Sequence, residues 1–167
     1  MEKRRLAADV LPGYDPEIGR WLWALEDVRR TVKAAVGGLS QELLDAKPEG
    51  WNSIGSLLYH VAAIEADWLC DEVMGSHWPD EIVSLFTVDV RDDQGLLAAV
   101  SGMTLEEHLT RLDLVRSVLL DHFRSMSVEE FRRVLAPPLF GERRRHLYSR
   151  HMYMEREVNG IPLLRYY

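Results

Sequence analysis

The spacing of the apolar residues most constrains what this chain can fold into. Through four long segments they recur every three or four positions, and nowhere do they alternate with polar residues over the length of a strand. Such spacing places apolar side chains on one face of an α-helix. The pattern predicts helices at about residues 15–36, 53–74, 104–126 and 142–158. We therefore expect one all-α domain over residues 1–167, a four-helix bundle around one apolar core.

Local signals mark where these helices begin and end. Asp15 followed by Pro16 is typical of an N-cap and a first helical position, and Thr104 with Glu107 forms a capping box. The connection over residues 75–103 is long for a compact domain, and we interpret it as a crossover between the second and third long helices. Three shorter helical segments are expected near residues 40–46, 80–86 and 128–134.

The composition excludes several classes of function. Lys and Arg number 20 against 27 Asp and Glu, a net charge of −7, which argues against binding to nucleic acid. No stretch is apolar enough over about 18 residues to span a membrane, and the charged N-terminus does not resemble a signal peptide. Cys70 is the only cysteine, so an intrachain disulfide is impossible. We expect a cytoplasmic protein without nucleic-acid or membrane partners.

Two of the six histidines lie on predicted apolar faces. His60 lies between Leu57 and Ile64, and His151 is in register with the apolar face of the last predicted helix. Glu155 follows His151 by four residues, so both side chains can reach one point. Two imidazoles and a carboxylate suit a divalent ion such as zinc, iron, nickel or manganese. The alternative is a pair of hydrogen-bonded core histidines. The other three histidines considered are expected at the surface: His77, His108 and His122.

Other familiar catalytic patterns are missing from the sequence. It has no glycine-rich phosphate loop, no Gly-x-Ser-x-Gly elbow and no Cys-x-x-Cys pair, so it identifies no catalytic residue. Glu65 and Asp67 follow His60 and could accept a hydrogen bond from its imidazole, although packing roles are the simpler interpretation. Trp21 and Trp68 are expected in the core.

The segment that ends at Trp68 carries a distinctive arrangement of residue types. A Leu-Ser pair, a proline and a tryptophan precede Ser-Ile, Leu, His, Glu and Trp, with one residue, Asn52, inserted between the tryptophan and Ser-Ile. The residues that carry the pattern are Leu39, Ser40, Glu42, Leu43, Pro48, Gly50, Trp51, Ser53, Ile54, Leu57, His60, Glu65 and Trp68. In these residues the chain resembles the DinB/YfiT family of metal-dependent proteins, and the resemblance covers most of the chain.

The resemblance implies a fold and a set of metal ligands. The fold would be a four-helix bundle with a long crossover between helices 2 and 3, commonly a homodimer. The metal would be held by one histidine of the second long helix, which His60 matches, and by a His-x-x-x-His pair of the last helix. Residues 151–155 read His-Met-Tyr-Met-Glu, so Glu155 stands where the second histidine of that pair is expected.

Other registers of the last helix would give other ligands. One places Tyr153 and Glu157 at the ligand positions, and another places Glu155 and Asn159 there. We prefer His151 with Glu155, because this register keeps a true histidine and puts both side chains near the buried face. The predicted metal ligands are therefore His60, His151 and Glu155.

The resemblance also implies a class of reaction. Relatives include enzymes that use low-molecular-weight thiols, so we expect a hydrolase or a thiol-dependent S-transferase that acts on small molecules. Because Cys70 is the only cysteine, such a thiol would come from outside the chain. The alternative is a non-catalytic bundle that has lost the metal site and serves as a stress-response or interaction module.

Overall fold

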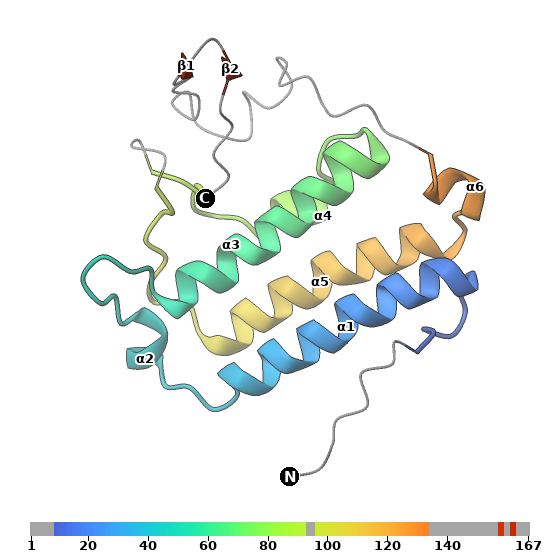
Figure 1. The fold of residues 1–167 in the computed structure, drawn as a ribbon. Helices are drawn as coiled ribbons and strands as arrows, with labels where there is room; N and C mark the ends of the chain where they lie inside the picture. The colour runs from blue at the N-terminus through green and yellow to red at the C-terminus, as the bar shows by residue number, and fades with distance from the viewer. Residues whose placement is uncertain (1–8, 93–95, 134–156, 159–160, 163–167) are drawn as a thin grey trace.

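The computed structural model describes residues 9–92, 96–133, 157–158 and 161–162 (Figure 1). Three long elements account for most of this part: α1 at Pro16–Val36, α3 at Ile54–Asp67 and α5 at Leu105–Arg124. They confirm the first three predicted helices. The fourth, predicted at residues 142–158, lies outside the described residues except for its last two.

The predicted helix starts are confirmed at atomic detail. The Asp15 carboxylate accepts a hydrogen bond from the Glu17 amide at 2.8 Å, and Ser53 caps α3 in the same way. At the start of α5, the Thr104 hydroxyl accepts from the Glu107 amide at 3.2 Å, and the Glu107 carboxylate accepts from the Thr104 amide at 2.7 Å. Each bond satisfies an amide that has no partner within its helix.

Shorter elements complete the described part of the chain. The helix that begins as α3 continues as the π-helix η1 at Trp68–Met74, and it ends at Gly75, where φ is +61°. A positive φ is the conformation that glycine adopts without strain. The remaining helices are single turns or little more: α2 at Gln41–Asp45, α4 at Asp80–Val83 and α6 at Val128–Phe131.

The helix α5 lies between α1 and α3, and each of these packs against it (Figure 1). One buried cluster joins α1, η1 and α5 through Ile18, Leu22, Leu69, Cys70 and Leu119. A second joins α2, α3 and α5 and continues to the end of α1; its members are Val36, Leu44, Leu58, Ala62 and Leu112. The described core therefore lies along α5, which contacts both neighbours.

The long connection between η1 and α5 contains α4 where a short helix was expected. Side chains of the long helices bond its backbone at several points. Three such pairs are Tyr59 with Val88, Ser56 with Val100 and Arg111 with Leu85. The connection is thus held against α3 and α5 by specific polar contacts as well as by apolar packing.

Two short strands lie near the C-terminus. Strand β1 at Glu157–Val158 pairs antiparallel with β2 at Ile161–Pro162, with Val158 opposite Ile161. The predicted last helix was therefore wrong in its final two residues. The sequence Asn159-Gly160 between them favours a two-residue hairpin, which competes with continuation of a helix.

Elsewhere the described chain is helical or irregular, as expected for an all-α fold. Among the described helices, none combines the length and the apolar character that a membrane span requires.

Candidate functional site

A groove runs between α1 and α3, with α5 as its floor. It encloses a cavity of about 540 Å³ whose lining is almost wholly apolar. Trp21 and Leu25 of α1 form one wall, Val61 of α3 forms part of the other, and Leu119 of α5 lies beneath them. Only three lining residues carry ionisable side chains: His60, Glu65 and Arg116.

Two apolar stripes border this groove. On α1 and on α3 the exposed residues recur at spacings of three, four or seven, which places each set on one helical face. The exposed members are Trp21, Leu25, Val28 and Val32 on α1 and Leu57, Val61 and Trp68 along α3 and η1. Trp21 and Trp68 were expected in the core; the described part of the chain leaves them 64% and 53% exposed. Aligned apolar stripes of this extent indicate a surface that something covers.

His60 lies on the α3 wall of the groove and is half-buried. Its Nδ1 atom is buried and has no hydrogen-bond partner in the part of the chain that the structure describes. Burial, reinforced by the nearby charge of Arg91, lowers the pKa of His60, so the ring is neutral at neutral pH. A neutral imidazole with a free nitrogen is the form in which histidine binds a metal. The chemistry of His60 therefore fits the role predicted for it.

The other two predicted ligands, His151 and Glu155, lie outside the described residues. Within the described ranges, no three histidine, cysteine or acidic side chains are grouped so that they could hold a metal ion. The predicted metal site, with all three of its ligands, therefore stays a prediction.

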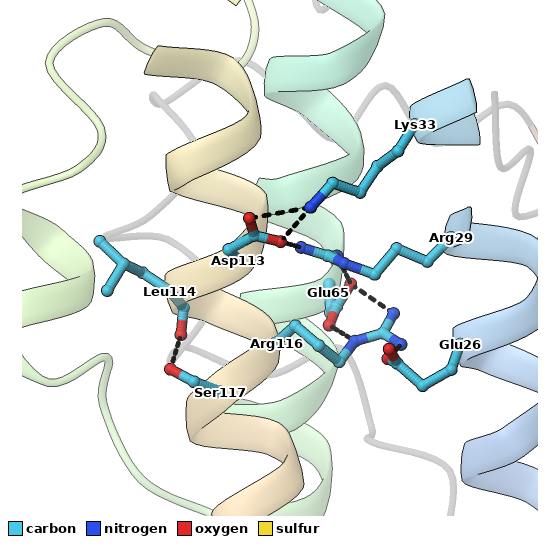
Figure 2. Close-up of polar contacts among 8 residues, drawn as sticks. All are labelled: Glu26, Arg29, Lys33, Glu65, Asp113, Leu114, Arg116 and Ser117. Atoms are coloured by element: carbon cyan, nitrogen blue, oxygen red, sulfur yellow. Dashed lines mark hydrogen bonds and ion pairs between the residues drawn. The ribbon is translucent and has the colours of Figure 1, made fainter. Parts of the chain in front are cut away.

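The floor of the groove carries a partly buried ion-pair network that joins all three long helices (Figure 2). Arg116 of α5 donates from Nε to Glu65 Oε1 at 2.5 Å and from Nη2 to Glu65 Oε2 at 2.9 Å. Its Nη1 atom donates to Glu26 of α1 at 2.6 Å. Burial by itself lowers the pKa of Arg116, but the bonds to Glu65 and Glu26 outweigh it and raise the pKa. The guanidinium is therefore charged and bound at both edges.

The network continues along α1. Arg29 contacts Glu65 at 4.0 Å and pairs with Asp113 of α5 at 2.6 Å, and Lys33 pairs with the same Asp113 at 2.9 Å (Figure 2). Three cations thus meet three carboxylates, so the floor of the groove has no net charge. Both Glu65 oxygens are occupied by Arg116, which assigns Glu65 to this network in place of the imidazole acceptor considered from the sequence. A weak signal for Arg116 existed in the sequence, since it follows Leu112 by four residues and precedes Leu119 by three, which places it on the apolar side of α5.

The expectation that His108 lies at the surface was wrong. Its exposed fraction is 1%, because the N-terminal half of α5 packs against α2, α3 and the long connection. Gly55 on α3 makes the room: a Cβ at that position would lie 3.1 Å from His108 Nε2. His77 is exposed, as expected, and His122 is half-buried.

A known protein family matches most of the chain. The DinB superfamily profile matches residues 24–154, which include His60 and His151 and end one residue before Glu155. No curated protein matches the chain.

Proposed function

The chain belongs to the DinB superfamily, and on that premise we propose that it is a metal-dependent four-helix-bundle protein. The divalent ion, whether zinc, nickel, iron or manganese, is held by His60 of α3 together with His151 and Glu155 of a fourth helix. The observation that carries the proposal is the position of His60: it lies on the wall of an apolar groove, with a buried Nδ1 that has no hydrogen-bond partner among the described residues.

The groove supports a fourth helix at the remaining corner of the bundle. Because α5 packs between α1 and α3, the side opposite α5 is bordered by two apolar stripes that no described residue covers. The apolar face predicted for residues 142–156, with Leu147 and Met154 on it, is suited to that position. At about 1.5 Å per residue, a helix of this length spans roughly 22 Å, comparable with α3 at about 21 Å.

The positions of His60 and His151 along the long axis of the bundle are consistent with this arrangement. Figure 1 shows α6 at the end of the bundle where α3 runs into η1, and Phe131 of α6 lines the groove. A helix that starts at this end runs antiparallel to α3. With residue 142 placed at the level of Trp68, His60 lies eight residues, about 12 Å, from that level, and His151 lies nine residues, about 13.5 Å, from it. His151 and His60 would therefore lie at nearly the same level.

The residues of the groove define the chemistry available. A divalent ion held by His60, His151 and Glu155 would supply Lewis-acid chemistry, which suits attack by water or an external thiolate on an electrophile. The apolar walls exclude water and admit a small uncharged molecule, while the Glu65–Arg116 pair adds no net charge. We accordingly propose a hydrolase or a thiol-dependent S-transferase for small molecules, assembled as a homodimer.

Metal analysis tests the proposal directly. Protein purified without a histidine tag is expected to bind close to one divalent ion per chain, and His60→Ala should lose it. His77→Ala is the matched control, because His77 is exposed and away from the groove lining. Glu155→Ala and Glu157→Ala then test the register: only the first should weaken binding. A wild-type protein whose melting temperature is unchanged by zinc, nickel or manganese would refute the metal site.

One observation favours a second candidate. Glu155 replaces the histidine expected at the end of the ligand pair, and such a replacement is also what a bundle that has lost its metal would show. On that alternative the protein is a non-catalytic stress-response or interaction module. Metal-free wild-type protein that is fully folded would favour it.

A further inference from the structure

A second polar cluster lies away from the groove, at the N-terminal half of α5, and its centre is a buried arginine. Arg111 is 7% exposed, and its nearest partners in the described part of the chain are neutral. Nε donates to the Leu85 carbonyl at 2.7 Å, Nη2 contacts Met103 Sδ at 3.4 Å, and the guanidinium lies 4.6 Å from the centre of the Tyr59 ring. Leu85 and Met103 belong to the long connection between η1 and α5, so a single side chain holds it at two points.

Tyr59 holds the same connection from α3. Its hydroxyl donates to the Val88 carbonyl at 2.7 Å and accepts from the Val88 amide at 3.0 Å. Because Arg111 lies over the Tyr59 ring, the two anchors are in contact with each other. Loss of Arg111 from its place would therefore loosen the connection on the α5 side and remove a contact from the α3 side.

His108 is the neighbour on which the position of Arg111 depends. Its Nδ1 atom lies 3.4 Å from Arg111 Nη1. An arginine has no acceptor, so His108 must be neutral, with its lone pair on Nδ1 and its hydrogen on Nε2. The Nε2 atom is buried without a partner among the described residues, and the α3 residue packed against it is Gly55.

The other charged groups around His108 come from two elements. Glu107, its neighbour on α5, and Asp45 of α2 are both negative. Asp45 Oδ2 accepts hydrogen bonds from the Gly102 amide at 3.0 Å and from Gln41 at 2.9 Å, whereas Oδ1 is buried without a partner among the described residues. Glu107 is bound to Thr104 in the capping box. Arg111 is therefore the ionised group that contacts the imidazole directly.

We propose that His108 is an acid-sensitive latch for the connection between η1 and α5. Protonation would put a hydrogen on Nδ1, so that two cations face each other at 3.4 Å in a buried site. Arg111 would then leave its place, and the contacts with Leu85 and Met103 would be lost together. The latch uses no metal and does not depend on the proposed function of the groove.

The electrostatics of the cluster support the direction of this change. Burial, followed by the charge of Arg111, lowers the pKa of His108, and Asp45 and Glu107 only partly offset the effect. In an opened connection the imidazole regains its ordinary pKa of about 6.5, so acid draws the equilibrium towards the open form. If only the open form binds the proton, the opening equilibrium at pH 5.5 is about tenfold larger than at pH 7.5.

Amide hydrogen exchange on the full chain, in the presence of EDTA, tests the latch. The amides of Val88, Val100 and Gly102 report on the connection, because each is bonded to a side chain of the helices. After correction for intrinsic exchange rates, their protection is expected to fall about tenfold between pH 7.5 and pH 5.5, while amides within α1 keep theirs. In His108→Gln, whose amide oxygen accepts but does not titrate, protection should be the same at both values.

The matched control is His122→Gln, because His122 is also on α5 and has a buried Nε2 but lies at the opposite end of that helix from His108. It should behave as the wild type does. A loss of protection in His108→Gln equal to that of the wild type would overturn the latch, as would an equal loss in α1. If His108→Gln fails to fold, NMR of the wild type decides. The Arg111 Nε resonance should then shift with the same midpoint as the His108 ring, and independent midpoints would refute the proposal.

Discussion

The ion-pair network on the groove floor makes a quantitative prediction about stability. Replacing Arg116 by methionine keeps most of the side-chain volume but removes three charge-assisted hydrogen bonds from Glu65 and Glu26. The Glu65 side chain is 13% exposed and stays close to the apolar lining, whereas Glu26, at 30%, can turn towards water. Removing one partner of a buried pair costs about 3–5 kcal/mol, so for this partly exposed network we expect about 2–4 kcal/mol.

Urea unfolding followed by tryptophan fluorescence and circular dichroism measures this cost. With a denaturant slope of about 2 kcal/mol per molar, typical for a domain of this size, the midpoint should move down by about 1–2 M. Arg30→Met is the matched control, since Arg30 makes an exposed pair with Asp27 within α1. That surface pair should be worth less than about 1 kcal/mol.

A double-mutant cycle with Glu65→Met isolates the pair itself. If the main cost of losing Arg116 is the carboxylate left behind, the double variant should be more stable than the sum of the single effects predicts, by at least about 1.5 kcal/mol. A urea midpoint for Arg116→Met within about 0.3 M of the wild-type midpoint would refute the reasoning. Strictly additive effects of the two single substitutions on stability would refute it as well.

The remaining predictions concern four single residues. Gly55→Ala should destabilise the fold by about 1–3 kcal/mol in urea unfolding, because the new Cβ would meet His108 Nε2 at 3.1 Å and the Leu44 carbonyl at 3.3 Å; an unchanged midpoint would contradict this. Tyr59→Phe loses both bonds to Val88 and should cost about 1–3 kcal/mol by the same assay. The pKa of His108 is lowered in the fold, so the neutral ring's contribution to stability is complete above about pH 6.5 and is lost as the pH falls below that value. Urea midpoints should therefore decline towards pH 5.5 less steeply in His108→Gln than in the wild type. Burial, followed by Asp71 and Asp67, raises the pKa of the Cys70 thiol to about 11, so at pH 8 Cys70 should react with a disulfide reagent only after denaturant is added; rapid reaction of the native protein would show that the site opens.

The sequence by itself determined the features that depend on near neighbours along the chain. The start of α1 at Asp15 and the capping box of Thr104 and Glu107 were predicted and are present, because their bonds join residues two or three positions apart. The placement of His60 facing the groove followed from its spacing to Leu57 and Ile64, since helical period fixes which side chains share a side. Family membership likewise rested on a local pattern of residues.

Only the tertiary structure decided which polar side chains are buried and what they contact. Arg116 meets Glu65 across 51 positions and Glu26 across 90, and His108 is buried because Gly55 of another helix leaves space for it. Trp21 has the spacing of a core residue, yet it is exposed on a wall that no described residue covers. Helical spacing tells which residues share a face, but whether a partner covers that face depends on packing between segments far apart in the chain.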